Sequence, residues 1–513
     1  MAQAGAETGG QYYIHKGLQQ KKSTQREDTE PGRMAAYIID RIPARFDVYE
    51  DYDISEEHLA EAIVDTCGRY IRYCPQIGWM VYNAEDGCWK ERYAESAVQR
   101  VIIHFGQLLL EGTVDINQGE LRFARHILSS SGINAVKSIL RYHPRIVIEQ
   151  DQFDANPDLL NCKGDLYNLR SGEARPAEPE DYISKSMYCK ATPAKGAEQP
   201  PLPRLFEEFL AKVTGKEGQV RPDLAIFIMY WFGYCLTGDS GAAFFVNFHG
   251  TGKNGKSVLL RLMMQLFGDY AAPISKDVII ENRFASQFNL QDLPGIRLAV
   301  LSDAPEGRLN METIKQLTTG DIISAQRKFL KNFAFKPVCK IAIGSNPRLT
   351  LKDTGMAIRR RIRLVPFDYV ITDEEEIINF DQRLMEEGPD ILAALIYLAK
   401  DYYRKGGGPR AFPPCAVVDE ASAEYLESED LVGRWVQERT EAAPGNAEGA
   451  TELYKDFIKW AEDEGVRKKM GKNKFGEHLS VHIPAKKKLN SGWVYQDIML
   501  KGGTASLPGA GSG

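Results

Sequence analysis

Residues 244–268 read FFVNFHGTGKNGKSVLLRLMMQLFG, and this stretch decides the fold. A short apolar run leads into the pattern G-x-x-x-x-G-K-S, and an apolar segment of helical length follows. Strand, glycine-rich loop and helix in this order are typical of a phosphate-binding P-loop. The backbone N–H groups of such a loop and the N-terminus of its helix surround phosphate oxygens. The stretch therefore predicts an α/β fold that binds a nucleoside triphosphate.

Each position of the loop has an expected role. Lys256 is expected to bridge the β- and γ-phosphates, and the Ser257 hydroxyl is expected to hold Mg²⁺. The other residues predicted to bind the nucleotide are Gly250, Thr251, Gly252, Lys253, Asn254 and Gly255. We expect Lys256→Ala to abolish hydrolysis and to leave the fold intact, because a P-loop lysine lies on a solvated loop.

Two further apolar strands end in polar side chains that suit the same site. Residues 297–303 (RLAVLSD) end at Asp303, the candidate carboxylate for the metal. Glu306 either orients the attacking water or is a surface acid of the loop. Residues 338–344 lead to Asn346, whose amide either senses the γ-phosphate or belongs to an Asn-Pro turn. These residues predict a parallel sheet whose strand ends converge on the phosphates.

A run of arginines, RRRIR at residues 359–363, precedes the apolar stretch LVPF. Such a run is usually a solvated face. Phosphoryl transfer is also accelerated by a guanidinium that a neighbouring subunit supplies to the γ-phosphate. If Arg360 or Arg361 has that role, the active species is an oligomer.

The composition limits the remaining possibilities. The 513 residues are 26% charged and 10% aromatic, with a net charge of −6, which excludes a uniformly basic polyanion binder. The eight cysteines form no C-x-x-C pair, so neither a zinc ribbon nor a disulfide framework is indicated. Residues 224–238 are apolar but shorter than a membrane span, and the polar first 33 residues lack a signal sequence. We therefore expect no membrane partner and a location in the cytoplasm, in a bacterial host.

The ordered motifs GTGKNGKS, RLAVLSD, KQLTTGDIISAQRKFLKNFAFKP, IAIGSNPRL and RRRIRLVPF resemble the superfamily-three helicase core of the phage and plasmid primase-helicase family. That family is related to the poxvirus D-five NTPase. The resemblance implies an AAA+ type ATPase that forms a hexameric ring, hydrolyses ATP with Mg²⁺ between subunits, and translocates on DNA during replication. The family commonly has Glu where this chain has Asp303, so Asp303 and Glu306 remain alternatives for the contacts to metal and water.

The resemblance also implies two DNA-binding regions. A hairpin at residues 323–335 would project into the ring channel, with cations for phosphates and an aromatic ring for a base. A C-terminal winged-helix module would hold the DNA backbone through the basic stretch 467–488. The candidate DNA-binding residues are Arg327, Lys328, Phe329 and Lys331 in the hairpin, and Lys468, Lys469, Lys486 and Lys487 in the module. The alternatives are an ordinary solvated hairpin and a solubilising face.

The sequence predicts seven segments. They are a disordered tail (1–34), an N-terminal α+β domain (35–195), a helical linker or collar (196–240), the helicase ATPase core (241–370), a helical segment (371–445), the winged-helix domain (446–502) and a flexible tail (503–513). The Asp51-Tyr52-Asp53 triplet spells the D-x-D of a primase but lies in an acidic stretch, so we interpret it as a loop. A separate primase or polymerase is therefore an expected partner.

Two other functions fit parts of the pattern. An ATP-gated, origin-binding initiator with little unwinding would use the basic C-terminal unit. A P-loop NTPase or kinase that does not act on nucleic acid would leave the basic hairpin and the arginine run without a role.

Overall fold

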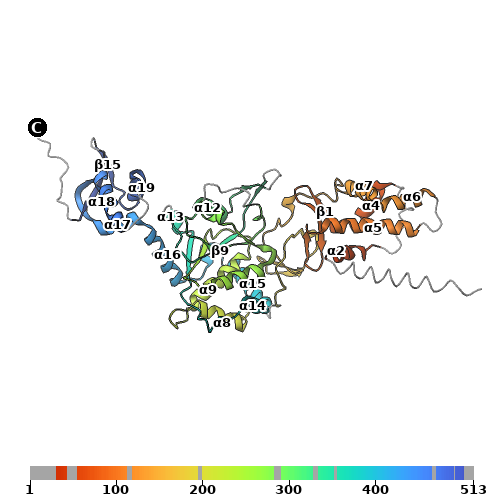
Figure 1. Ribbon diagram of the computed structural model, residues 1–513, viewed down its shortest axis with the longest axis horizontal. Helices are drawn as coiled ribbons and strands as arrows, with labels where there is room; N and C mark the ends of the chain where they lie inside the picture. Colours follow the sequence, from red (N-terminus) through yellow and green to blue (C-terminus); the bar gives the residue numbers. More distant parts are fainter. Residues whose placement is uncertain are drawn as a thin grey trace, which may run out of the picture.

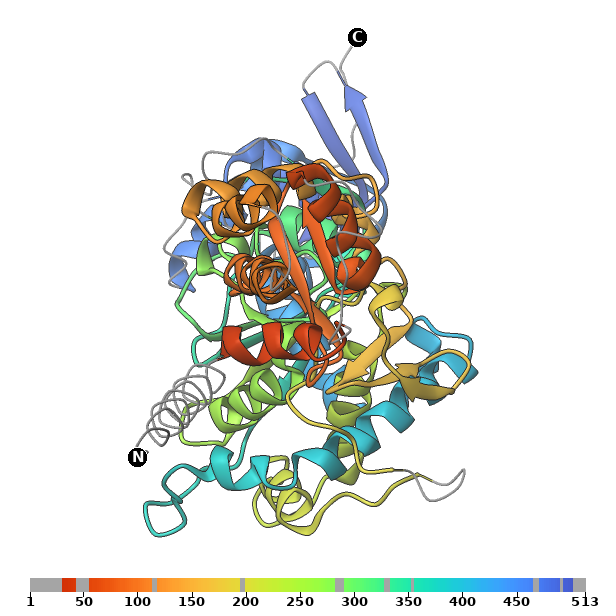
Figure 2. The same ribbon diagram turned by 90° about the vertical axis from the view of Figure 1, so that its right-hand side faces the viewer.

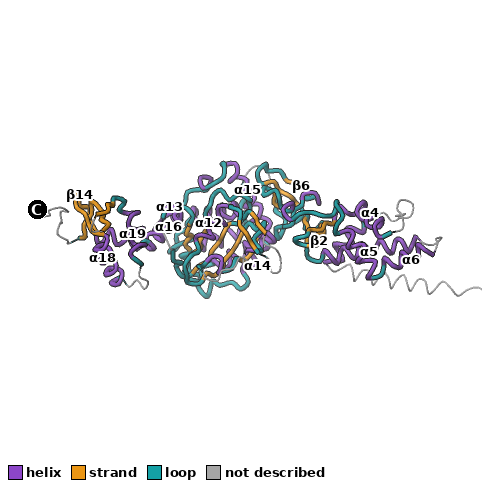
Figure 3. The backbone as a smooth tube through the Cα atoms, turned by 90° about the horizontal axis from the view of Figure 1, so that it is seen from above, coloured by secondary structure: helices purple, strands orange, loops and turns teal. Residues whose placement is uncertain are grey.

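The computed structural model describes residues 30–42, 55–112, 118–193, 199–281, 290–326, 333–351, 355–464, 470–489 and 492–501. These residues form an elongated molecule with an N-terminal unit at one end, a large central unit, and a small C-terminal unit at the other end (Figures 1 and 3). The candidates Arg327, Lys328, Phe329, Lys331, Lys468 and Lys469 lie outside the described residues, as do Asp51 and Asp53.

The N-terminal unit is a helical bundle joined to two small antiparallel sheets. Apolar residues recur at helical spacing near residues 56–71 and 95–110, and these stretches form most of α4 and α5, whose apolar faces share one core. Its helices are α2 (Glu30–Ile39), α4 (Glu56–Cys67), α5 (Ala94–Gly112), α6 (Gln118–Ile127) and α7 (Ser130–Leu140). The sheets are β1 (Ile71–Cys74), β2 (Gly78–Asn83) and β3 (Cys88–Lys90), followed by β4 (Leu159–Cys162), β5 (Asp165–Asn168) and β6 (Ala174–Pro176).

A five-stranded sheet forms the middle of the central unit. Its strands are β7 (Phe245–His249), β8 (Ala271–Pro273), β9 (Leu298–Ala304), β12 (Lys340–Ser345) and β13 (Ile362–Pro366), in the order β13-β7-β12-β9-β8. Every neighbouring pair is parallel. Parallel sheets are covered on both faces, which explains why these strands read as nearly continuous apolar runs. The predicted parallel α/β core is confirmed.

Helices cover both faces of this sheet (Figure 1). Val246 and Phe248 of β7 face a core built with α8, α9, α10, α14 and α15, whereas Phe245 faces a second core with α11, α12 and α16. The helices are α8 (Arg204–Val213), α9 (Pro222–Cys235), α10 (Lys256–Phe267), α11 (Lys276–Ile279), α12 (Met311–Thr319), α13 (Met356–Arg359), α14 (Phe380–Met385), α15 (Gly388–Arg404) and α16 (Ala416–Glu429).

Two predicted divisions differ from the packing. The segment 196–240, predicted as a linker or collar, contributes α8 and α9 to the same continuous core as the sheet, because its apolar side chains pack directly on β7. The start of the predicted helical segment, residues 371–379, forms turns instead, and helix begins at Phe380 after Asn379 adopts a left-handed conformation.

The predicted hairpin within residues 323–335 is present in the described part. Strands β10 (Ile323–Ala325) and β11 (Phe333–Phe335) pair antiparallel, with Ile323 opposite Phe335. This pair is separate from the five-stranded sheet.

The C-terminal unit combines three helices with a three-stranded sheet around Trp435 and Phe457. The helices are α17 (Leu431–Arg439), α18 (Ala450–Asp463) and α19 (Lys472–His482), and the strands are β14 (Thr440–Gly449), β15 (Lys486–Leu489) and β16 (Gly492–Leu500). The sheet order is β14-β16-β15. The predicted boundary at residue 446 therefore falls inside β14, whose ladder with β16 ties residues 440–449 to this unit.

Among the described residues, no helix is both long enough and apolar enough to cross a membrane. The apolar stretch 224–238 corresponds largely to α9, which is buried in the central core.

Candidate functional site

The P-loop joins β7 to α10, as the sequence predicts. Its shape depends on glycine at two positions where the backbone φ is positive, Gly252 (111°) and Gly255 (82°). Glycine is required at position 250 for a different reason, because a Cβ there would lie 2.4 Å from the carbonyl oxygen of Phe367. The loop is therefore pressed against the chain that leaves β13, and its turns expose backbone N–H groups at the start of α10.

Lys256 is buried, with 4% of its surface exposed, and its ammonium contacts three oxygens of its own chain. The Nζ atom donates to the Gly250 carbonyl at 3.0 Å, to Asn254 Oδ1 at 3.2 Å and to Asn346 Oδ1 at 2.8 Å. Burial lowers the pKa of Lys256, and the nearby carboxylate of Asp303 opposes that shift. The expectation that this lysine lies on a solvated loop is wrong, because α8 and residues 371–381 cover the P-loop.

The strand register brings Asn346 and Asp303 to the phosphate end of the sheet. β12 lies between the P-loop strand β7 and β9, with Ser345 opposite both His249 and Ala304. Asn346 thus follows β12 at the level of the P-loop, where it contacts Lys256. Asp303 is an exposed residue of β9, one position before Ala304. The carboxyl ends of these parallel strands therefore converge as the sequence predicts.

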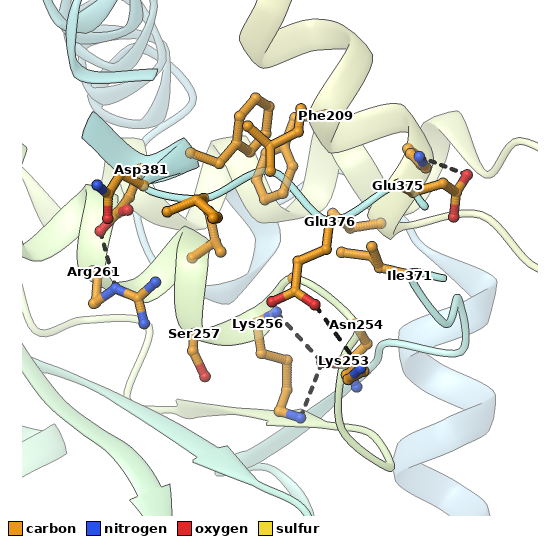
Figure 4. Close-up of a pocket in the computed structure, with 18 of the residues that line it drawn as sticks. Phe209, Lys253, Asn254, Lys256, Ser257, Arg261, Ile371, Glu375, Glu376 and Asp381 are labelled. Atoms are coloured by element: carbon orange, nitrogen blue, oxygen red, sulfur yellow. Dashed lines mark hydrogen bonds and ion pairs between the residues drawn. The ribbon is translucent and has the colours of Figure 1, made fainter. Parts of the chain in front are cut away.

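Oxygen atoms suited to a magnesium ion lie at this same end. Ser257 and Asp303 are both exposed, and Lys256 and Ser257 leave the start of α10 on the same side (Figure 4). The described residues hold no cluster of three or more His, Cys, Asp or Glu side chains that would form a protein cage for a metal. Mg²⁺ at phosphate sites takes one or two protein oxygens and otherwise phosphate and water, so this donor set fits it.

Glu306 is exposed on the loop that follows β9. That loop runs beside the chain after Asn346, because the Thr350 N–H donates to the Gly307 carbonyl at 2.9 Å. Glu306 and Asp303 thus both lie exposed at the phosphate end of β9, and either carboxylate is available to water there.

A pocket of about 750 Å³ opens over the P-loop (Figure 4). This volume is within the range of small-molecule sites, roughly 300–1,000 Å³. Its floor is the P-loop and the start of α10, one wall is α8, and its roof is the segment 371–382, which we call the strap. Apolar side chains of the roof and wall include Phe209, Ile371 and Phe380, and the rings of Phe209 and Phe380 are 5.5 Å apart.

Ion pairs fix the strap to the P-loop and to its flanking helices. The Lys253 ammonium contacts Asp373 and lies 3.9 Å from Glu376, and the Ile371 N–H donates to the Lys253 carbonyl at 2.6 Å. Glu375 accepts from Lys212 of α8 at 2.8 Å, and this contact lowers the pKa of Glu375 to about 2. The strap could not be identified from the sequence, because its acids stand in a segment predicted as helical and their lysine partners are distant in the chain.

The two candidate arginines differ in their surroundings. Arg361 is 4% exposed, and its guanidinium donates to the Ala357 carbonyl, whereas Arg360 is exposed. Burial and the neighbouring charge of Arg360 lower the pKa of Arg361. Both residues precede β13, which is parallel to β7 with Ile362 opposite Phe245. Because the P-loop follows the other end of the five-residue β7, the arginines and the P-loop lie about 16 Å apart along the strands.

Among the predicted DNA-binding residues, Lys486 and Lys487 are described and exposed on β15. They belong to the C-terminal unit, which α16 joins to the central unit (Figure 1). The structure thus separates them from the nucleotide site.

Comparisons with known proteins find two families. Residues 60–215 match the family described as D5 N terminal like, and residues 248–361 match a family of unknown function, DUF5906. The C-terminal region (305–718) of NrS-1 in its apo form is a similar solved structure, with a TM-score of 0.43 and 13% identity over 80% of this chain and 83% of that chain.

Two viral relatives carry provisional helicase names. Helicase L207/L206 of Acanthamoeba polyphaga mimivirus is 24% identical over 329 residues, 60% of this chain and 33% of that protein. Helicase 121R of Invertebrate iridescent virus 3 is 23% identical over 355 residues, 66% of this chain and 36% of that protein. The chain thus spans about a third of the length of these relatives. The two family matches cover most of the N-terminal unit and most of the predicted nucleotide site, and the chain is similar to the D5 N terminal like family and to these viral relatives.

Proposed function

We propose that the chain is an ATP-dependent DNA helicase of superfamily three, from a phage, plasmid or other mobile element. Its AAA+ type core would form a hexameric ring, hydrolyse ATP between subunits and translocate on DNA during replication. One observation carries this proposal: Lys256, Asn346 and Asp303 converge with the P-loop at one end of a parallel sheet, beneath a pocket of nucleotide size. The helicase names of the viral relatives favour DNA as the track.

Each residue of the site has a role in this proposal. The P-loop N–H groups and Lys256 hold the triphosphate, and Lys256 exchanges its contacts with Gly250, Asn254 and Asn346 for phosphate oxygens. A bound Mg²⁺ would neutralise phosphate charge, with Ser257 and Asp303 as its protein ligands. Asn346, once released from Lys256, is free to contact the γ-phosphate, and Asp303 or Glu306 orients the attacking water.

The arginines support catalysis between subunits. Arg360 lies at the end of the sheet opposite its own P-loop, about 16 Å away along β7, so it serves the nucleotide of a neighbouring copy. Its exposure suits it to this contact better than the buried Arg361. A guanidinium supplied in trans stabilises the charge of the transferring phosphoryl group.

DNA would contact two regions. The hairpin β10–β11 would face the ring channel, with Lys328 and Lys331 on phosphates, and the C-terminal unit would act as a winged-helix module. Primer synthesis would come from a separate primase or polymerase.

The test is ATP hydrolysis by the purified chain with and without single-stranded DNA, beside a measurement of its mass in solution. The proposal expects DNA to stimulate turnover in a ring-sized species, and strand displacement from a forked substrate. Hydrolysis by a monomer that ignores DNA would refute it and favour a small-molecule NTPase. A footprint confined to one sequence, without displacement, would favour an origin-binding initiator.

A further inference from the structure

The β15–β16 hairpin of the C-terminal unit presents an aromatic ring and two lysines on one face. Lys486 pairs with Tyr495 and Lys488 pairs with Trp493 in this antiparallel ladder. Opposite residues of a ladder share a face, and residues two positions apart on a strand share it too. These four side chains therefore lie on one face, which we call the Trp493 face, while Lys487 and Val494 lie on the other.

Burial changes sharply along the Trp493 face. Tyr495 is 3% exposed, and its hydroxyl donates to the Gly476 carbonyl of α19 at 3.0 Å. Trp493, two residues nearer the turn, is 50% exposed. Tyr495 thus anchors the hairpin to the helices, and Trp493 lies beyond that anchor. In Figure 2 the two strands extend past the helices of their own unit.

A cation is fixed beside the exposed ring. Lys486 Nζ lies 5.4 Å from the centroid of the Trp493 ring and donates to Ser480 Oγ of α19 at 3.0 Å. This bond to α19 holds the ammonium between helix and hairpin. Lys488, directly opposite Trp493, is also exposed. The Trp493 face thus offers an aromatic surface with positive charge at its edge.

These features select the chemistry of the partner. Residues 486–488 are three consecutive lysines, and the acid of β16, Asp497, accepts a hydrogen bond from the Gly445 N–H at 2.8 Å. Positive charge therefore predominates beside Trp493 and favours an anionic partner. A half-exposed indole on a projecting strand suits a flat apolar group, and nucleobases stack on aromatic side chains in single-strand sites. A continuous duplex exposes its phosphates but not the faces of its bases. An unpaired strand offers both groups together.

We propose that the Trp493 face binds single-stranded DNA, with an unpaired base stacked on Trp493 and the adjoining phosphates on Lys486 and Lys488. This inference rests on the proposed function, since it takes the ligand to be DNA. It goes further in that the C-terminal unit reads a separated strand rather than the backbone of a duplex. The unit then contacts DNA where base pairs have already opened.

The test is photo-crosslinking of the full-length protein to an oligonucleotide that carries 5-iodouracil, with the site mapped by peptide mass spectrometry. We expect a crosslink at Trp493 with the single strand and none with the same sequence as a closed duplex. Trp493→Leu should lose it and bind the single strand about 5- to 150-fold more weakly if stacking is lost. Trp493→Phe should retain most of the affinity. Gln496→Ala, an exposed change on the opposite face, is the matched control.

Other results would overturn the inference. Equal crosslinking to duplex and single strand would show that the face contacts only the DNA backbone. Unchanged single-strand binding by Trp493→Leu would show that no base stacks on this ring. Near-ultraviolet circular dichroism of each variant checks that the unit remains folded. If DNA stimulates ATP hydrolysis by the wild-type chain but Trp493 does not crosslink, this inference fails alone. If DNA neither stimulates hydrolysis nor binds, the proposed function fails with it.

Discussion

Arg360→Ala is expected to stop ATP hydrolysis and to leave nucleotide binding intact. The arginine lies at the end of the sheet opposite its own P-loop, about 16 Å away along the five residues of β7, so its removal does not touch the pocket of its own chain. Arginine fingers accelerate phosphoryl transfer by about 10³- to 10⁵-fold. We therefore expect turnover to fall by at least about 10³-fold, with unchanged affinity for a fluorescent ATP analogue.

Mixing two inactive variants tests whether the arginine acts between subunits. Lys256→Ala lacks a working P-loop but keeps Arg360, and Arg360→Ala has the reverse defect. In a randomly mixed ring from equal amounts, half of the P-loops are intact and half of the neighbouring arginines are intact. About one quarter of the sites then contain both parts, so hydrolysis should return to about a quarter of the wild-type rate.

The assay is steady-state phosphate release by each variant alone and after co-incubation and reassembly. Arg410→Ala, an exposed arginine on the turn that follows α15, is the matched control and should behave as wild type. A mixture no more active than its parents, despite confirmed co-assembly, would refute catalysis in trans. Normal hydrolysis by Arg360→Ala would remove this residue from the mechanism.

Four further outcomes are expected. Arg361→Ala should lower the free energy of unfolding by about 0.5–1.5 kcal/mol in urea denaturation, because the hydrogen bond from its buried guanidinium to the Ala357 carbonyl is lost. Lys256→Ala should abolish hydrolysis in the phosphate assay and leave the thermal melting temperature close to wild type, because the lysine holds only its own loop and Asn346. Lys340 is buried with its pKa lowered to about 7, so between that value and about 10.4 the unfolded chain binds more protons and stability rises with pH. Lys340→Met lacks this titration but also loses the hydrogen bonds to the Thr237 and Val338 carbonyls, so the pH dependence is the test: in urea denaturation its free energy of unfolding should fall by about 2 kcal/mol relative to wild type between pH 7 and pH 9. Lys328→Ala with Lys331→Ala should weaken DNA binding and flatten its salt dependence in fluorescence anisotropy, while unchanged unwinding would remove the hairpin from the mechanism.

The convergence of Asp303 and Asn346 on the P-loop was predictable because it follows from local order alone. Each residue ends an apolar strand, and parallel strands place their carboxyl ends at one edge of the sheet. The order of the strands in the sheet does not follow from local sequence, yet it decides which of these residues contacts Lys256. Because β12 lies between β7 and β9, Asn346 contacts Lys256 directly, while Asp303 acts on it from one strand further away.

The strap and the arginine run show what sequence patterns miss. Residues 373–376 are four consecutive acids in a segment predicted as helical, but the lysines that pair with Asp373 and Glu375, Lys253 and Lys212, are more than a hundred residues away in the chain. No local pattern predicts such ion pairs. Similarly, the sequence RRRIR suggests one charged surface. In the structure the Arg361 carbonyl accepts from the Phe245 N–H at the start of the sheet, and Arg361 is buried whereas Arg360 is exposed.

The position of Asn346 links the nucleotide site to the C-terminal unit. Beyond Asn346, the chain contacts α16: the Tyr425 hydroxyl donates to the Leu349 carbonyl, and the Leu351 N–H donates to Glu429 at 2.8 Å. Helix α16 runs directly into α17 of the C-terminal unit, and Asp430 between them lies 3.9 Å from Arg359, next to the arginine proposed to act in trans. Under the proposed function, a phosphate that draws Lys256 away from Asn346 would act at one end of this short chain of contacts. The other end of that chain is the unit that carries Trp493.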